Sequence, residues 1–311
     1  MAVSSDPASL LAAVTSGDRR ALARLISILE DRREGHDEVL PLAFAAARPA
    51  HRIGITGAPG SGKSTLTDAL IRVIRESGEP VAVLAVDPTS PFSGGAVLGD
   101  RVRMQDHVLD DGVYIRSMAS RGHLGGLSAA APKALLALEA AGFPIVIIET
   151  VGVGQDEVEV AAAADTVIVV VTPGWGDGIQ AAKAGILEIG DLFVVNKADR
   201  PGADDAVAEL RAMLALGLET GWETPIVQTV ATKGSGVREG WKAIEAHREH
   251  LGAVGLDKAR GRRRRTELET ALVEILREKA TEIAARSGAV PTAVEAGDLD
   301  PWTGARRLAG G

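Results

Sequence analysis

The chain has 311 residues, 46% of them apolar, which is enough for a large buried core, and its net charge of −8 argues against a nucleic-acid partner. It contains no cysteine, which excludes disulfides, thiolate zinc sites and cysteine nucleophiles. The N-terminus lacks a basic-then-apolar signal pattern, and we find no run of about 18 apolar residues that would span a membrane. We therefore expect a cytoplasmic protein that has no membrane partner.

Residues 7–48 are predicted to be helical. Asp18 is a candidate N-cap and Gly35 is expected to stop a helix. Apolar residues recur there at helical spacing, namely Leu22, Leu25, Ile26 and Leu29. Because this region carries no catalytic pattern, we expect residues 1–49 to form a helical extension that packs on the main domain.

Residues 50–252 alternate between predicted strands and predicted helices. Most of the strands are near-continuous apolar runs, which are typical of strands covered on both faces. The expected strands are 52–56, 81–86, 113–117, 144–149, 166–172, 191–195 and 225–229, with helices such as 127–141 and 204–216 between them. The alternation predicts an α/β fold with a doubly wound, mostly parallel sheet, whose ligands should bind at the carboxyl ends of the strands.

A complete phosphate-binding loop lies between the first strand and a helix expected over 65–76. Its backbone N–H groups would surround a phosphate chain at the N-terminus of that helix. Lys63 is expected to reach the β and γ phosphates, and the Ser64 hydroxyl is expected to bind Mg²⁺. The nucleotide-binding residues expected here are Gly57, Ala58, Pro59, Gly60, Ser61, Gly62, Lys63, Ser64 and Thr65. A glycine-rich turn with no ligand is the alternative, and the Lys-Ser pair in register argues against it.

Acidic residues at strand ends are the candidate metal ligands. Asp87 and Glu149 each end an apolar strand, and Asp100 lies in the long loop 88–112. Asp87 could orient the attacking water or contact Mg²⁺, and Gly152 could donate its N–H to the γ-phosphate. We expect Lys63, Asp87 and Glu149 to be catalytic, and Asp100 is left open between a metal ligand and a solvated loop residue.

A second motif indicates guanine. Asn196, Lys197 and Asp199 form an N-K-x-D pattern at the end of a predicted strand. The Asp199 carboxylate can accept hydrogen bonds from guanine N1–H and its exocyclic amine, a pair of donors that adenine lacks. Lys197 should lie along the base and pack on the phosphate loop, while Asn196 should tie the loop together. After the last strand, Val230, Ala231 and Thr232 are expected to contact the base.

Other charged residues of the loops have no decided role. Arg101, Arg103 or Arg121 could stabilise a phosphate in cis, although each is also compatible with a surface charge. His123 is interpreted as a structural histidine.

Residues 253–311 are predicted to form a C-terminal helical arm. The charged segment 256–286 has apolar residues at helical spacing, namely Leu268, Leu272, Ile275 and Ile283. A partner subunit is the expected cover for this stripe, and packing on the chain's own N-terminal helices is the alternative. The run 262–265 of four arginines is interpreted as a solvated face or pairing surface, and His247 and His250 lack a third zinc ligand.

These motifs resemble the MeaB/ArgK family of P-loop GTPases, which includes the methylmalonic aciduria type A proteins. The resemblance covers nearly the whole chain. Its most particular stretches are E-T-V-G-V-G-Q at 149–155 and L-G-D-R-V-R-M at 98–104, and the motifs at 57–65, 86–91, 120–127, 196–199 and 300–302 accompany them.

The resemblance implies a homodimeric GTPase that binds GTP or GDP with Mg²⁺ and hydrolyses GTP slowly. It implies a chaperone that gates cofactor loading and protection of an adenosylcobalamin-dependent acyl-CoA mutase, usually methylmalonyl-CoA mutase. In the family, the positions of Asp87, Asp100 and Glu149 are associated with the metal and with switch movements.

Three other functions are less compatible with the sequence. A P-loop kinase acting on a small metabolite or transport component would need an acceptor pocket, which the sequence does not indicate. A metal-insertion GTPase would need a Cys/His cluster. A partitioning ATPase would carry a lysine where this chain has Ala58.

Overall fold

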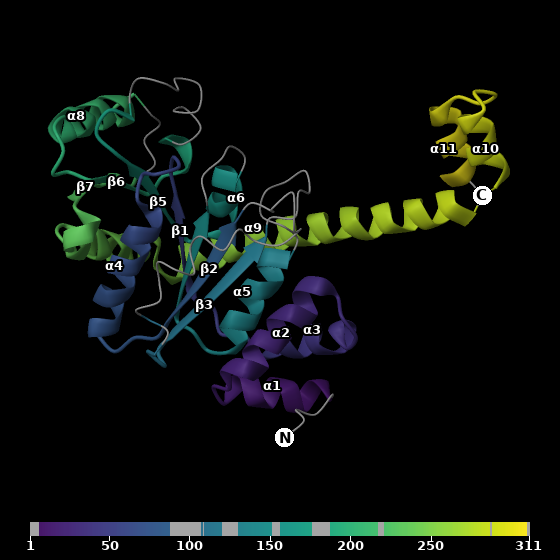
Figure 1. The fold of residues 1–311 in the computed structure, drawn as a ribbon, viewed down its shortest axis with the longest axis horizontal. Coiled ribbons are helices and arrows are strands. Elements are labelled where there is room, and N and C mark those ends of the chain that lie inside the picture. The colour runs from purple at the N-terminus through teal and green to yellow at the C-terminus, as the bar shows by residue number, and fades with distance from the viewer. Residues whose placement is uncertain are drawn as a thin grey trace. The chain divides into compact units, whose positions relative to one another are not determined.

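The computed structural model describes residues 6–87, 107, 109–119, 130–150, 156–175, 187–216, 221–286 and 288–309. The chain divides into two compact units, Met1–Asp257 and Lys258–Gly311. The ribbon in Figure 1 labels the elements of both units.

A seven-stranded sheet forms the centre of the first unit. The strands are β1 (His51–Thr56), β2 (Val81–Asp87), β3 (Val113–Ala119), β4 (Ile145–Thr150), β5 (Thr166–Val171), β6 (Leu192–Asn196) and β7 (Ile226–Thr229). They lie in the order β3-β2-β4-β1-β5-β6-β7, and every pairing between them is parallel. The strand order reverses beside β1, so the phosphate loop that follows β1 lies at a switch point of the sheet.

Helices cover both faces of this sheet, as the predicted α/β class requires (Figure 1). They are α4 (Lys63–Glu76), α5 (Ala130–Ala140), α6 (Asp156–Ala163), α8 (Ala203–Leu214) and the start of α9 (Val237–Arg286). Side chains alternate along a strand: Val81 and Val83 of β2 pack in the core with α4, whereas Ala82 and Leu84 pack with α5. The helix α4 therefore covers one face of the sheet. Glu149 of β4 points toward the same face, because its side chain contacts Ser64 of α4.

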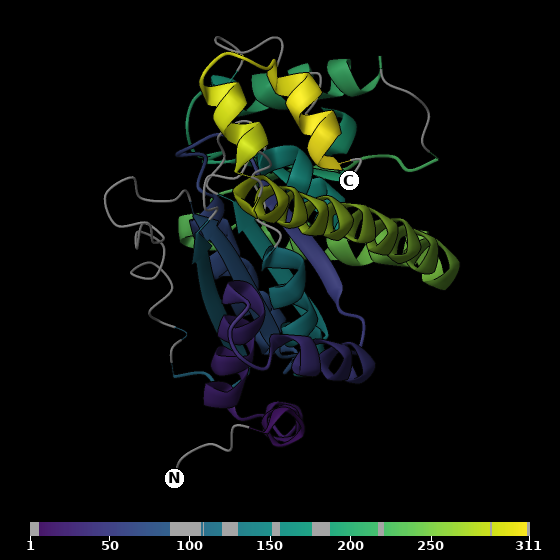
Figure 2. The ribbon, with the colours of Figure 1, turned by 90° about the vertical axis from the view of Figure 1, so that its right-hand side faces the viewer.

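Three N-terminal helices share a core with α5. They are α1 (Pro7–Thr15), α2 (Arg19–Asp31) and α3 (His36–Ala46). The helices α2 and α3 lie beside α5, and α1 packs on α2 and α3 (Figures 1 and 2). Asp18 caps α2 as predicted, because its carboxylate accepts from Arg20 N and Ala21 N at 2.8 and 3.0 Å. The expected role of Gly35 is wrong: α2 already ends at Asp31, and Gly35 instead precedes α3 with φ of 86°.

The second unit contains the distal part of α9, α10 (Ala289–Glu295) and α11 (Pro301–Ala309). The predicted helix over 256–286 is confirmed, and it belongs to an element that begins at Val237 and has one non-helical residue, Gly252. Across the described ranges, no helix combines the length and the apolar character that crossing a bilayer demands.

A buried polar cluster lies at the amino ends of β1, β5 and β6, at the edge of the sheet opposite the phosphate loop. The Thr166 hydroxyl lies 2.9 Å from Nδ1 of His247 and 3.1 Å from Nε2 of His51. Asp191 accepts from Val167 N at 2.8 Å, and its other carboxylate oxygen lies 3.4 Å from His247 Nε2. Burial raises the pKa of Asp191 from 3.8 to about 6, and burial lowers the pKa of His247 from 6.5 to about 4.

The two shifts give opposite pH dependences of stability. Because the folded state holds a proton on Asp191 more tightly than the unfolded state, this group lowers stability as pH rises from about 4 to about 6. His247 binds its proton less tightly when folded, so it raises stability as pH rises from about 4 to about 6.5. The two contributions therefore offset each other in the intact chain.

We predict that replacing either residue exposes the slope of the other. In urea unfolding between pH 4 and 6.5, Asp191→Asn should gain stability with rising pH more steeply than the intact chain, and His247→Gln should lose it. Each slope is bounded by about 1.4 kcal/mol per pH unit, the limit for one proton. Parallel pH profiles for the two variants would contradict this assignment.

Candidate nucleotide-binding site

The loop 57–62 joins the carboxyl end of β1 to the first turn of α4. Lys63, the first residue of α4, is buried, and its ammonium donates to Gly57 O at 2.7 Å and to Ala58 O at 3.1 Å. Gly62 occupies the N-cap position, and no side chain caps the first N–H groups of the helix. The N-terminus of α4 therefore presents backbone donors and the positive end of its dipole at the loop, the arrangement that binds phosphate groups.

The close approach of Asn196 explains the glycine at position 62. Gly62 has φ of 96°, and a Cβ added there would lie 2.3 Å from Asn196 Nδ2. A residue with a side chain would therefore be strained in its backbone and would displace Asn196. The Gly-Lys-Ser step of the phosphate loop and the asparagine of the N-K-x-D motif are matched sterically.

Asn196, the last residue of β6, joins three segments through its buried amide. Its Nδ2 donates to Ser61 O in the phosphate loop at 2.9 Å. Its Oδ1 accepts from Thr229 Oγ1 and from Ala231 N, each at 3.1 Å. The predicted role of Asn196 in tying the loop together is confirmed. Asn196 also holds the 3₁₀ turn at 231–233, through its bond from Ala231 N.

Lys197 and Asp199 follow on the same surface. The Lys197 ammonium donates to Gly60 O at 2.7 Å, so its predicted packing on the phosphate loop is confirmed. Lys197 has a left-handed backbone with φ of 58°, which turns the chain sharply after β6. The Asp199 carboxylate is half-exposed and accepts from Lys233 Nζ at 3.1 Å, and this bond lowers the pKa of Asp199 below its usual range. An ionised Asp199 has acceptors only, as recognition of guanine donors requires.

Of the three residues after β7 that are expected to contact the base, two donate their backbone N–H groups to other residues of the protein. The N–H of Val230 donates to Ser235 O at 3.0 Å, and that of Ala231 donates to Asn196 Oδ1. Thr232 lies between them and Lys233, within the 3₁₀ turn. These bonds fix the loop beside the N-K-x-D motif.

Glu149 and Ser64 form a buried polar contact at the phosphate loop. The Ser64 hydroxyl donates to Glu149 Oε1 at 2.5 Å, and the exposed fractions of Ser64 and Glu149 are 8% and 2%. Glu149 lies on β4 opposite Ile55 of β1, so its side chain faces the loop that follows β1. A hydroxyl and a carboxylate held side by side below a phosphate-binding loop are oxygen donors of the kind that Mg²⁺ prefers. These residues fit the metal that P-loop chemistry implies.

Among the remaining predicted site residues, the structure describes only the backbone of Asp87. Asp87 ends β2 two residues after Ala85, the partner of Glu149, so its backbone lies at the same edge of the sheet. The other residues that the sequence singles out lie outside the described residues, namely Asp100, Arg101, Arg103, Arg121, His123 and Gly152.

Comparison with known proteins identifies the family. The family model described as "Methylmalonyl Co-A mutase-associated GTPase MeaB" matches residues 22–285. The chain belongs to the MeaB family. It is 46% identical over 301 residues to a Pyrococcus horikoshii protein that carries a provisional GTPase name, and the match covers 95% of both chains. The predicted membership of the MeaB/ArgK group is thus confirmed, and the chain is a P-loop GTPase.

Two further relatives of this MeaB-family chain bear on its role. It is 32% identical over 265 residues to the mouse protein named "Methylmalonic aciduria type A homolog, mitochondrial", a match that covers 79% of this chain and 64% of the mouse protein. A solved structure titled "LAO/AO transport system kinase" is 28% identical, with a TM-score of 0.72 and coverage of 97% and 96%.

Two contributors to the site were missed in the sequence. Thr229 holds Asn196, and Lys233 holds Asp199. Both lie in the T-V-A-T-K stretch at the end of the last strand. Their polar character at a strand end was the sequence feature that could have indicated a role in the site.

Proposed function

We propose that this MeaB-family GTPase gates the loading and protection of an adenosylcobalamin-dependent acyl-CoA mutase, with methylmalonyl-CoA mutase as the partner. The observation that carries the proposal is the joining of the phosphate loop to the N-K-x-D motif through Asn196, in a chain that matches a mutase-associated family. We place its action in the cytoplasm.

In this proposal the loop 57–65 binds the phosphates of GTP or GDP, and Lys63 contacts the β and γ groups. Ser64 and Glu149 hold Mg²⁺, together with Asp87 and Asp100. Mg²⁺ would neutralise charge that develops on the phosphate oxygens during hydrolysis. Glu149 accepts a hydrogen bond from the Ser64 hydroxyl and so orients it, while Asp87 orients the attacking water and Gly152 donates to the γ-phosphate.

Guanine is recognised by the second half of the site. Asp199 accepts from guanine N1–H and from the exocyclic amine, and Lys197 lies along the base. The segment 230–232 closes the pocket from β7. Lys233 orients the Asp199 carboxylate, because it donates to one of its two oxygens.

We predict that Asp199→Asn loses guanine selectivity, because an amide presents a donor where guanine also presents one. In competition between GTP and ATP for binding, the preference for GTP should fall at least about a hundredfold. Lys233→Gln is the control, since it removes the neighbouring charge but leaves the acceptor oxygens in place. An Asp199→Asn protein with unchanged preference would contradict this role.

We also propose that the second unit forms a homodimer interface. Apolar side chains are exposed along the distal part of α9, namely Leu268, Leu272, Val273, Ile275, Leu276 and Ile283. Their spacing places most of them on one side of the helix, and such a stripe is stable in water when another apolar surface covers it. Sedimentation of the full chain should give a dimer, and a monomeric mass at micromolar concentration would refute this part.

The direct test of the proposal is GTP turnover by the full chain, alone and with purified methylmalonyl-CoA mutase. We expect the mutase to raise the turnover of GTP and to leave ATP unused. Lys63→Ala protein is the control for contaminating GTPases, because loss of the phosphate-binding lysine should abolish turnover. Turnover that ignores this mutase would refute the partner and leave the GTPase assignment intact.

The similarity to a structure titled as a transport system kinase favours a second candidate, a P-loop kinase acting on a small metabolite or transport component. The same reaction mixtures, with an amino acid added, distinguish this kinase from the mutase-gating GTPase. Transfer of the γ-phosphate to an added amino acid, instead of release as inorganic phosphate, would establish the kinase and overturn the chaperone proposal.

A further inference from the structure

One face of α4 carries a continuous polar stripe that begins at the nucleotide site. Ser64, Asp68, Arg72 and Arg75 are spaced by four, four and three residues, so they lie one above another along the helix. Ser64 contacts Glu149, and Asp68 pairs with Arg72 at 2.9 Å. GTP hydrolysis as described above uses only the first of these residues. Asp68 and Arg75 hold a different part of the chain, and Arg72 pairs with Asp68.

His107 docks on this stripe one helical turn beyond Ser64. Its Nε2 lies 2.8 Å from Asp68 Oδ1, and the imidazole is buried, with 8% of the side chain exposed. An ionised carboxylate only accepts hydrogen bonds, so Nε2 of His107 carries the hydrogen. Asp68 thus receives His107 on one oxygen and Arg72 on the other. A buried, charge-assisted pair of this kind is costly to break.

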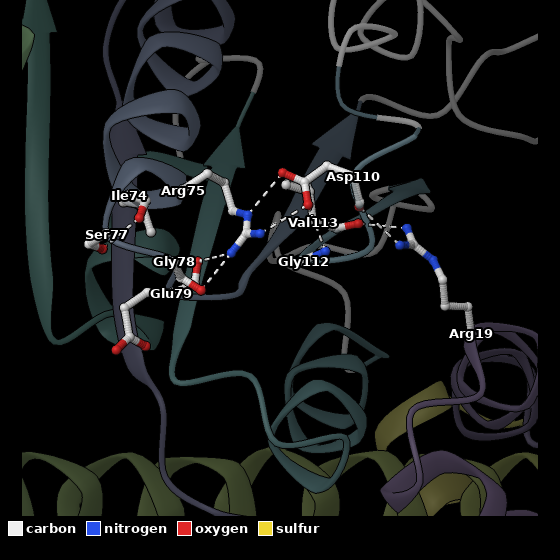
Figure 3. Close-up of polar contacts among 9 residues, drawn as sticks. All are labelled: Arg19, Ile74, Arg75, Ser77, Gly78, Glu79, Asp110, Gly112 and Val113. Atoms are coloured by element: carbon white, nitrogen blue, oxygen red, sulfur yellow. Dashed lines mark hydrogen bonds and ion pairs between the residues drawn. The ribbon is translucent and has the colours of Figure 1, made fainter.

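Asp110 is held further along the same stripe. Arg75 donates to both carboxylate oxygens of Asp110, at 2.9 and 3.1 Å, and this bidentate bond lowers the pKa of Asp110 (Figure 3). The guanidinium also donates to Gly78 O and Glu79 O, each at 2.8 Å. A Cβ added to Gly112 would lie 2.2 Å from the Arg75 guanidinium carbon, so a glycine there leaves room for the close approach.

The N-terminal helices hold the same turn from its other side. Arg19, the first residue of α2, donates to Asp110 O at 3.2 Å and to Val113 O at 2.6 Å. Figure 3 shows Arg19 and Arg75 approaching the turn from two different helices. The backbone at 110–113 is therefore fixed by α2, while the side chains of His107 and Asp110 are fixed by α4.

We propose that Asp68 and His107 are positioning residues for GTP hydrolysis. Their contact holds the segment that leads into β3 at a fixed position on α4, on the face of that helix that carries Ser64. Asp68 lies four residues after Ser64 on one rigid helix, so a shift of His107 relative to Asp68 is a shift relative to the Ser64–Glu149 pair. The sequence connects Asp87 to His107 by the residues 88–106. The contact sets where that connection ends.

The proposal concerns the chemical step and not the affinity for nucleotide. Among the residues that the structure describes, the side-chain hydrogen bonds of Asp68, His107 and Asp110 do not reach the phosphate loop or the N-K-x-D motif. Misplacement of supporting residues costs rate steeply, because reacting groups must be held within fractions of an ångström. The proposal depends only on GTP hydrolysis by this chain and is independent of any mutase.

The test is steady-state GTP hydrolysis by the full chain with Mg²⁺ and without mutase, well below the melting temperature of each variant. His107→Ala should lower kcat about tenfold or more and leave KM within about twofold. His107→Gln should recover most of kcat, because its side-chain amide can donate to Asp68. Asp68→Ala should reproduce the loss, and it keeps α4 intact because alanine is the strongest helix former.

Glu76→Ala is the matched control. It removes another carboxylate of α4, which pairs with Arg238 at an exposed position, and it should leave kcat and KM unchanged. The proposal is overturned if Asp68→Ala keeps the kcat of the intact chain, or if His107→Gln is as slow as His107→Ala. A fall in melting temperature with unchanged kcat would mean that the contact is only structural.

Discussion

The side-chain amide of Asn196 is the interaction on which the nucleotide site depends. Its donor fixes the phosphate loop at Ser61, and its acceptor fixes Thr229 and Ala231 of the segment after β7. Both ends of the amide are buried, so loss of either set of bonds would leave polar groups without water. The parallel sheet makes this contact available, because β1, β6 and β7 all end at one edge.

The helix α4 connects that edge of the sheet with other parts of the first unit. Its N-terminus faces the phosphate site, its apolar side packs on the sheet, and its polar stripe holds the turn before β3. The N-terminal helices reach the same turn through Arg19. Nucleotide chemistry and the helical extension are thus connected through one rigid element.

Much of the fold followed from local pattern. The strands β1, β4, β5 and β6 are buried at every residue, as their continuous apolar runs predicted, whereas β7 is partly exposed. The predicted bounds of all seven strands lie within about two residues of the observed ones. The phosphate loop and the N-K-x-D motif were found because each is a short contiguous sequence. The end of α2 was missed because Arg32 adopts a left-handed backbone that glycine usually supplies, and Gly35 gave the expected signal at the wrong place.

Contacts between distant segments were beyond sequence reasoning. His107 and Asp68 are 39 residues apart, and Arg19 and Val113 are 94 apart, with no motif at either end. The partners of Asn196 were also invisible, since Ser61 contributes a backbone carbonyl that any residue could provide. Such pairings depend on which strands and helices become neighbours, and this depends on the order of strands in the sheet.

The most direct test of this account is GDP binding by Asn196→Ala, measured by calorimetry at a temperature where the variant is folded. Thr229→Val is the control, because it removes only one of the bonds to Asn196. If the amide holds both halves of the site, Asn196→Ala should weaken GDP binding by at least about a hundredfold, and Thr229→Val should have a much smaller effect. A folded Asn196→Ala protein that binds GDP as tightly as the intact chain would contradict the account.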